Sequence, residues 1–322
     1  MKILFLGRND EKRYYSSFPM KHTLLESKQL ICYGVGYENY KRDCFLGIFD
    51  SRRRDIFKVI RRLYSDDQPD VILIDVCWPL HCDWENLDKV EIPKALIFDD
   101  PHFQPDERIE YIRKNKIDLV LFVYKYSIPH FKDKINCRIE WLPWSVNTSI
   151  FKDYGLDRTY DVSFLGHTNP RAYPFRTKIV ETLSKHPDIK FFTKEHPGGS
   201  WNLDPKKHLI GENYARVVAQ SKIFAFDTGI YNGAIAKFYE GMACNTLVAA
   251  PMPFDGEELH FKPEYNFVTI DEHNFLEKIL YYLKHEHERL EIAKRGYETV
   301  RKYHTVEIRA KQLIDYLKKI AK

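Results

Sequence analysis

The chain has 322 residues, of which 44% are hydrophobic and 30% are charged, and its formal net charge at pH 7 is +4. This composition excludes a disordered chain, and the length is sufficient for two globular domains. The small net charge gives no reason to expect nucleic acid as a partner, and no run of 18 apolar residues predicts a membrane span. The first residues enter an apolar run directly, so we expect no secretory signal.

The cysteines indicate a reducing compartment and no metal site. No two of the six have the C-x-x-C spacing, and most lie in apolar segments, which is typical of reduced core thiols in a cytoplasmic protein. Cys77, His81 and Cys82 are close in sequence, but a fourth zinc ligand at a suitable spacing is missing. We therefore expect neither a metal nor a cofactor.

Continuous apolar runs alternate with helical segments through the first half of the chain, which predicts a parallel sheet covered on both faces. The expected strands are residues 2–7, 31–36, 71–76, 95–98, 119–123 and 138–142. Helices are expected at residues 52–64, where Ile56, Phe57, Ile60 and Leu63 share one face, and at residues 106–114.

The alternation weakens near residue 150, at Pro143 and a polar Asn-Thr-Ser cluster, and then restarts. Strands are expected at residues 161–166, 189–193, 223–226, 247–249 and 267–270, and helices at 171–186, 213–220, 234–243, 274–284, 285–303 and from 306 onwards. The predicted fold is α/β, with two Rossmann-like, doubly wound parallel-sheet domains that face a cleft. We assign residues 1–150 to the first domain, 151–305 to the second, and 306–322 to a helix that packs back on the first.

The loops that follow the strands of the second half carry glycines and cations. Ligands of such sheets bind beyond the carboxyl ends of the strands, where these loops meet. A helix N-terminus that follows Gly166 offers N–H groups to a phosphate. Further groups that suit a diphosphate follow at His167, Arg171, Arg176, Lys194 and His196. Together they predict a pocket that needs no metal, whereas each cation taken alone could equally be a surface residue.

A second loop, residues 227–234, contains Gly229, Asn232 and Gly233 and is another candidate cradle for a phosphate or a sugar. It is not a Walker A loop, and the segment after the first strand lacks the Gly-x-Gly-x-x-Gly fingerprint of NAD-binding proteins. Glu240 is on the following helix, beside the strand ends. An ionised carboxylate there can accept hydrogen bonds from the hydroxyls of a ribose or a sugar, but a solvated helix residue would have no such role.

Several ordered motifs occur together in this second half. They are Tyr160-Asp-Val-Ser-Phe-Leu-Gly166 with Arg171 and Arg176, Lys237-Phe-Tyr-Glu240-Gly-Met-Ala-Cys244 followed by Leu-Val, Ile292-Ala-Lys-Arg-Gly296, and Tyr303-His-Thr305 leading to Arg309. Through them, residues 160–317 resemble the C-terminal domain of the GT-B glycosyltransferases, closest to the spore-maturation (CgeB-like) branch of the group-1 transferases. The first half resembles the family only in its fold pattern.

The resemblance implies a glycosyltransferase whose second domain binds a nucleotide-sugar donor of the UDP or GDP type. It also implies that Glu240 contacts the donor ribose and that the Gly166 loop lies near the donor phosphates. Two residues depart from the family pattern, because Asn232 stands where retaining relatives have a glutamate and Asn245 stands where a glycine is usual. The first departure leaves open whether the sugar configuration is retained or inverted.

The acceptor side is predicted from the first half. An inverting reaction needs a base for the acceptor proton, and either Asp100 or His102 suits that role. The same segment could instead form an Asp-Pro turn that caps the helix near Gln104. Further candidates for acceptor binding follow the first and third strands, and they are Arg8, Asn9, Asp75 and Trp78.

A basic helix at residues 51–62 is typical of packed helices with a solvated face, but it also suits an anionic membrane surface. The acceptor is therefore left open among a glycan, a lipid-linked molecule and a protein. Asp99 and Asp100 form an acidic pair of the kind that holds a metal in other transferases. Taken together, the residues favour a cytoplasmic, metal-independent, hexosyltransferase-type enzyme, which could also lie against the inner face of the membrane. The alternatives are a nucleotide-sugar epimerase of the same fold and a non-catalytic sugar- or nucleotide-binding module.

Overall fold

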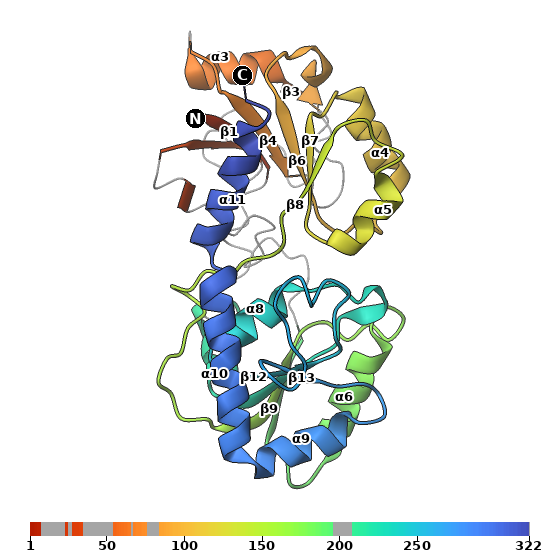
Figure 1. Ribbon diagram of the computed structural model, residues 1–322, viewed down its shortest axis with the longest axis vertical. Coiled ribbons are helices and arrows are strands. Elements are labelled where there is room, and N and C mark those ends of the chain that lie inside the picture. The colour runs from red at the N-terminus through yellow and green to blue at the C-terminus, as the bar shows by residue number, and fades with distance from the viewer. Residues whose placement is uncertain are drawn as a thin grey trace. The chain divides into compact units, whose positions relative to one another are not determined.

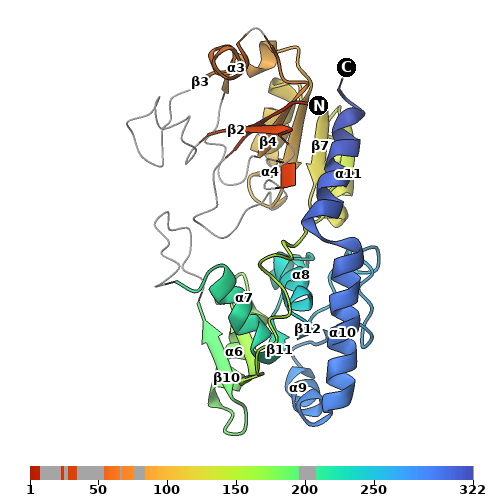
Figure 2. The same cartoon turned by 90° about the vertical axis from the view of Figure 1, so that its left-hand side faces the viewer.

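The computed structural model describes residues 1–7, 23–24, 28–34, 54–65, 67–75, 84–195 and 208–321. The chain forms two compact units, which are shown in two views in Figures 1 and 2. Unit 1 contains the described residues up to Pro143 together with the C-terminal segment from Glu307. Unit 2 contains Trp144–Val306.

Unit 1 is built on a six-stranded sheet with the order β2-β1-β4-β6-β7-β8. Every neighbouring pair in it is parallel, and almost every residue of the four central strands is buried. This burial on both faces explains the continuous apolar runs of the sequence. The strands are β1 (Ile3–Leu6), β2 (Leu30–Tyr33), β4 (Val71–Asp75), β6 (Lys94–Phe98), β7 (Leu119–Phe122) and β8 (Arg138–Trp141).

Three helices of unit 1 share one buried apolar cluster with one face of this sheet, and they are α3 (Ile56–Tyr64), α4 (Pro105–Lys114) and α5 (Ile128–Phe131). The C-terminal helix α11 (Val306–Lys318) is joined to β8, because Gln312 Nε2 and Tyr316 Oη each donate a hydrogen bond of 3.2 Å to the carbonyl of Trp141. The chain therefore returns to unit 1 after completing unit 2.

The helix predicted from residue 52 begins later in the structure. Arg54–Asp55 form a short strand, β3, which pairs with β5 (Trp84–Glu85). The Asp55 side chain then caps α3 by accepting a hydrogen bond of 2.9 Å from the N–H of Phe57. An aspartate at this position satisfies a backbone donor that the helix itself leaves open, so it fixes where the helix begins.

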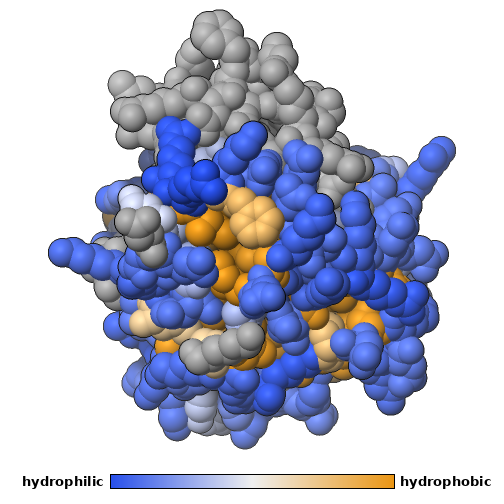
Figure 3. All heavy atoms as spheres, turned by 90° about the horizontal axis from the view of Figure 1, so that it is seen from above, coloured by the Kyte–Doolittle hydropathy of each residue, from blue (hydrophilic) through white to orange (hydrophobic). Residues whose placement is uncertain are grey.

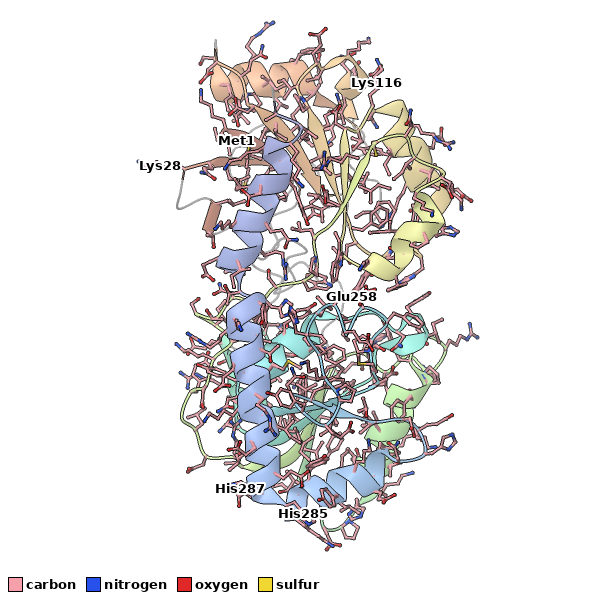
Figure 4. All side chains as sticks on the ribbon, in the orientation of Figure 1. Met1, Lys28, Lys116, Glu258, His285 and His287 are labelled. Atoms are coloured by element: carbon pink, nitrogen blue, oxygen red, sulfur yellow. The ribbon has the colours of Figure 1, made fainter. Side chains whose placement is uncertain are left out.

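Unit 2 is built on a five-stranded parallel sheet with the order β10-β9-β11-β12-β13. Its strands are β9 (Tyr160–Leu165), β10 (Phe191–Lys194), β11 (Ser221–Ala225), β12 (Leu247–Ala250) and β13 (Val268–Thr269). Its helices are α6 (Pro174–Lys185), α7 (Glu212–Ala219), α8 (Ala236–Ala243), α9 (Phe275–Lys284) and α10 (Glu286–Tyr303). The last two meet at His285, which is labelled in Figure 4.

Two helix starts of unit 2 differ from the prediction by more than one residue. The helix expected from residue 171 begins at Pro174, because proline suits the first helical position, and α8 begins at Ala236 rather than 234. Gly241 lets α8 approach the sheet closely, since a Cβ there would lie 2.6 Å from a methyl group of Val248. Among the described helices, none is both long and apolar enough to cross a membrane.

The strand order reverses once in each sheet, beside its first strand. In unit 1 the reversal is between β1 and β4, and in unit 2 it is between β9 and β11. Ligands of doubly wound sheets bind beyond the carboxyl ends of the strands at such a point. A ligand of unit 2 is therefore expected at the loops after β9 and β11, and a ligand of unit 1 at the ends of β1, β4 and β6.

Candidate functional site

Arg176 joins the loops that follow β9 and β11. Its side chain is only 4% exposed, and its guanidinium donates to the carbonyls of His167 at 2.8 Å and Asp227 at 2.7 Å. The guanidinium carbon also lies 3.7 Å from the ring centroid of Tyr173. Through these contacts Arg176 supports both loops from within. Two of its guanidinium nitrogens are therefore occupied by backbone carbonyls.

The other predicted groups of the diphosphate pocket have different surroundings. Arg171 is exposed in the turn before α6, and Lys194 is exposed at the end of β10. His167 is exposed as well, with its Nδ1 2.9 Å from a carboxylate oxygen of Glu195. His196 lies outside the described residues.

The N-terminus of α6 offers fewer N–H groups than the sequence predicts. Pro174 has no N–H, and the N–H of Arg176 donates to Asp227 Oδ2 at 3.0 Å. The phosphate site at this helix end stays a prediction, with fewer available N–H groups to support it.

Glu240 lies in the second turn of α8, where its side chain is partly buried. Tyr214, on α7, donates a hydrogen bond of 3.1 Å from its hydroxyl to Glu240 Oε2. Burial raises the pKa of Glu240, while the charge of Lys237 and the hydrogen bond from Tyr214 act in the opposite direction. Glu240 is therefore a carboxylate held in place by a neighbouring helix.

Lys237 lies one helical turn before Glu240 and is buried. Its Nζ is 5.8 Å from the ring centroid of Tyr214. Burial lowers the pKa of Lys237 to about 8, against the opposing effect of Glu240 and with a smaller contribution from Arg176. Lys237, Tyr214 and Glu240 thus form one cluster, which we call the α7–α8 cluster.

Lys237 and Tyr214 are not among the site residues predicted from the sequence. The motif Lys237-Phe-Tyr-Glu240 does contain a signal for the lysine, because helix residues three apart share a face. Tyr214 is 26 positions before Glu240, so only the packing of α7 on α8 brings the two together.

Asn232 links the loop after β11 to the segment after β12. Its Nδ2 donates to the carbonyl of Met252 at 2.9 Å, and its Oδ1 accepts a hydrogen bond of 2.8 Å from Thr228. The neighbouring Gly229 lies against Tyr173, since a Cβ there would be 2.7 Å from the ring. Gly233 is buried in the same loop. The Asn232 amide is thus used to fix the shape of the loop.

Asn245, the second departure from the family pattern, follows α8 with a φ of +53°. This is the left-handed conformation that favours glycine at a helix end, and asparagine tolerates it better than other side chains. Its Nδ2 also donates a hydrogen bond of 2.9 Å to Asp153. The substitution is therefore explained by the local backbone and does not disturb α8.

In unit 1, Asp99 and Asp100 follow β6 in a turn held by Arg108. The buried guanidinium of Arg108 donates to the carbonyls of both residues, and the distance to the carbonyl of Asp100 is 3.1 Å. Asp100 has a φ of +44°, and its N–H donates to Asp99 Oδ1 at 2.8 Å. The turn is closed by a backbone hydrogen bond of 3.0 Å from Phe103 to Asp100. Backbone strain of this kind is often found at functional sites.

The predicted acceptor residues that the structure describes lie at this edge of the sheet. Burial, followed by the charges of Asp100 and Asp75, raises the pKa of Asp99 well above its usual value. Burial lowers the pKa of His102, which favours the neutral imidazole that can accept a proton. Asp75 ends β4 beside Gly7, where a Cβ would lie 3.2 Å from that of Asp75. The predicted residues Arg8, Asn9 and Trp78 lie outside the described ranges.

Within the described ranges, no group of three or more His, Cys, Asp or Glu side chains could hold a metal ion.

Comparisons with known proteins bear on the family and on the fold. Residues 176–315 match a family described as glycosyl transferase-like. A glycosyltransferase from Rickettsia africae ESF-5 is 14% identical, with a TM-score of 0.69 over 100% of this chain and 98% of that one. HepE from Anabaena, whose crystal structure is a complex with UDP-glucose, is 12% identical, with a TM-score of 0.68 over 99% and 100%.

A sucrose-phosphate synthase from Thermosynechococcus elongatus is 14% identical, with a TM-score of 0.59 over 82% of this chain and 76% of that one. No curated protein matches the sequence significantly. At these identities the solved structures show the fold alone, and that fold has the two parallel sheets found here.

Proposed function

We propose that the chain transfers a sugar from a nucleoside-diphosphate sugar to an acceptor hydroxyl. Residues 176–315 match the glycosyl transferase-like family, and the chain has the GT-B fold predicted from its sequence. The observation that carries the proposal is the position of Glu240. This carboxylate lies on the helix between β11 and β12, is partly buried, and is held by Tyr214. The complex of HepE with UDP-glucose supports a donor of the UDP type.

Glu240 would bind the donor through the ribose. An ionised carboxylate accepts two hydroxyl hydrogen bonds, and a pair of vicinal hydroxyls is what a ribose offers. The diphosphate would then lie toward the loop after β9, where Gly166 has no side chain of its own to keep a ligand away from the backbone. Positive charge there would stabilise the negative charge that develops on the leaving diphosphate, without a metal.

The acceptor proton needs a base if the reaction inverts the sugar configuration. Asn232 cannot supply the charge that the glutamate of retaining relatives carries, and its amide is bonded to Thr228 and Met252. We therefore favour inversion, with His102 or Asp100 as the base. In that step the bond between the anomeric carbon and the diphosphate oxygen breaks, a bond to the acceptor oxygen forms, and the acceptor proton passes to the base.

The acceptor we favour is presented at an anionic lipid surface. The face of unit 1 that carries α3 is mainly hydrophilic but exposes some apolar side chains (Figure 3). The sequence predicts Phe57 on the apolar face of α3, but the structure leaves it 44% exposed while Ile56 and Ile60 are buried. The exposed cations Lys58 and Arg61 lie on the same side of the helix as Phe57. An aromatic ring between cations suits the interface of an anionic bilayer, which offers both apolar and negatively charged groups.

Nucleotide binding tests the donor site. We expect calorimetry to show UDP binding to the wild type, with weaker binding of 2′-deoxy-UDP. Glu240→Gln should weaken UDP binding by about 10- to 100-fold, which corresponds to the loss of hydrogen bonds to a charged group. It should also reduce the discrimination between the two nucleotides, because the carboxylate that distinguishes them is gone. If UDP and GDP compounds all fail to bind the wild type, the proposal is wrong.

Turnover separates this function from its alternatives. A transferase should release UDP from UDP-glucose faster when acceptor is present. An epimerase would convert the sugar without releasing UDP, and a binding module would bind the donor without any turnover. Free UDP and the sugar can both be followed by chromatography, so each outcome is distinct.

A further inference from the structure

Lys237 is a buried cation whose ammonium has no hydrogen-bond or ion-pair partner in the described part of the chain. It is the second residue of α8, and its side chain is 6% exposed. Among the residues that the structure describes, none accepts a hydrogen bond from its ammonium or forms an ion pair with it. Burial of a charge is costly unless a partner compensates for it. An anionic ligand would provide that compensation.

The ammonium lies beside the loop after β9. A Cβ on Gly166 would be 3.2 Å from Lys237 Cε and 3.4 Å from its Nζ, so the end of the side chain rests against this glycine. The ring of Tyr214, whose hydroxyl binds Glu240, is also near, with its centroid 5.8 Å from the ammonium. In a nucleoside diphosphate, the phosphates are attached directly to the ribose. A ribose on Glu240 therefore places the first phosphate within the surroundings of Lys237.

The neighbouring cations are less suited to this position. The Arg176 guanidinium is occupied by the carbonyls of His167 and Asp227. Arg171 and Lys194 are exposed, so water and salt weaken their attraction for a phosphate. Lys237 alone in this group combines burial with an ammonium that has no acceptor among the described residues. Low local dielectric makes its interaction with an anion stronger.

We propose that Lys237 is the cation that binds the diphosphate of the donor nucleotide, in a subsite formed with Gly166 of the β9 loop. This inference deepens the proposed function and depends on it, because it assumes that Glu240 binds the ribose. Lys237 would also stabilise the diphosphate as the leaving group, since it touches the atoms on which negative charge accumulates.

The site should couple nucleotide binding to proton uptake. The charged and titratable groups that influence Lys237 are Glu240 on its own helix, Arg176 from α6, and Tyr214 from α7. Because the pKa of Lys237 is about 8, Lys237 is neutral in most molecules of the free protein above that pH. A bound diphosphate favours the ammonium, so binding at pH 8.5 should draw a proton from the solvent.

The experiment compares Lys237→Met with the wild type. Lys194→Met tests the other lysine that could bind the diphosphate, and Lys185→Met is the matched control. Lys185 is an exposed lysine at the C-terminal end of α6. UDP and uridine, which lacks the phosphates, are titrated by calorimetry at pH 8.5 in two buffers of different ionisation enthalpy. The buffer dependence of the heat gives the number of protons taken up.

We expect Lys237→Met to weaken the binding of UDP by about 10- to 100-fold and the binding of uridine by less than about twofold. The proton uptake that accompanies UDP binding should be abolished. Lys185→Met should change none of these. If UDP binds the wild type and Lys237→Met retains both affinity and proton uptake, or if only Lys194→Met loses them, the inference is wrong and the proposed function stands. If neither UDP nor GDP binds the wild type, the proposed function fails first.

Discussion

The hydrogen bond from Tyr214 to Glu240 sets the pH range in which the carboxylate is available. The pKa of Glu240 is raised by burial and lowered by Lys237 and by this hydrogen bond. Tyr214→Phe keeps the ring and removes the donor, so the pKa of Glu240 should rise further. Because the ionised form binds the ribose, UDP affinity of the variant should begin to fall at a higher pH than in the wild type as the solution is acidified.

Calorimetric titration of UDP between about pH 5 and pH 7.5 measures this difference, since the range spans the region above the usual pKa of a glutamate. Tyr154→Phe is a suitable control, because Tyr154 donates to the carbonyl of Ile150 and not to Glu240. Superimposable pH profiles for wild type and Tyr214→Phe would show that the hydrogen bond has no influence on the carboxylate.

Lys237 should reduce stability in the absence of ligand. Its pKa is about 8 in the folded protein and 10.5 in its ordinary state, so the unfolded chain binds more protons between these values and stability rises with pH there. Below pH 8, Lys237 is protonated in both the folded and the unfolded protein, and the full cost of burying its charge remains. Lys237→Met should therefore stabilise the protein at pH 7, by on the order of 1–3 kcal/mol.

Thermal unfolding of the free protein from pH 7 to pH 10 tests this prediction. The unfolding temperature of Lys237→Met should exceed that of the wild type at pH 7, and the difference should shrink as pH rises toward 10. The unfolding temperature of Lys185→Met should equal that of the wild type at every pH in this range. A variant less stable than the wild type at pH 7 would instead indicate that Lys237 supports the fold.

Single residues also mark the limit of what the sequence predicts. Glu240 could be identified because its motif is continuous along one helix and a strand. Arg176 could be identified as a cation of the β9 loop, but its burial under Tyr173 depends on the loop after β11 and has no local signature. Tyr214 could not be identified, since its contact with Glu240 arises only from helix packing.

At the scale of elements, α3 makes the membrane proposal testable. Phe57 and Arg61 are one turn apart, Lys58 is beside them, and the first turn of the helix has no acidic residue. Each cation near an anionic surface contributes about 1 kcal/mol. We expect the protein to sediment with phosphatidylcholine vesicles only when they contain phosphatidylglycerol, and Lys58→Glu/Arg61→Glu to lose most of this binding.

Phe57→Ser should weaken vesicle binding at constant charge, because it removes the apolar contact. The matched control is Lys294→Glu/Arg301→Glu, which makes the same change of charge on exposed residues of α10. Equal losses in both double variants would mean that the effect comes from net charge. Binding to nucleic acid in place of vesicles would assign α3 to a different partner.

The elements themselves were largely predictable, for reasons that also explain the exceptions. Strands buried on both faces are continuous apolar runs, and six such strands of unit 1 lie where the sequence predicts them. The strands β3 and β5 have two residues each, which is too short for any periodicity. The start of α6 depends on Pro174, whose position outweighs the helical pattern that begins at Arg171.

At the scale of the whole molecule, the fold follows from alternation of strands and helices, whereas the chemistry does not. Parallel strands require crossover connections, so β-α alternation leaves few topologies. The donor site is predictable in outline, because ligands bind where the strand order reverses. Which cation meets the phosphate is decided by burial and by existing hydrogen bonds, and these depend on contacts between loops that are distant in sequence.

The absence of a required metal is the last consequence of a donor site built around Lys237. If side chains neutralise the diphosphate, UDP should raise the unfolding temperature equally in EDTA and in Mg²⁺. At a UDP concentration of 100 times Kd, the stabilisation should be about 2.7 kcal/mol, and Glu240→Gln should show much less at the same concentration. A shift that requires Mg²⁺ or Mn²⁺ would contradict the metal-independent mechanism. It would direct attention to the acidic pair Asp99 and Asp100, because Asp99 is the carboxyl whose raised pKa a bound cation would lower.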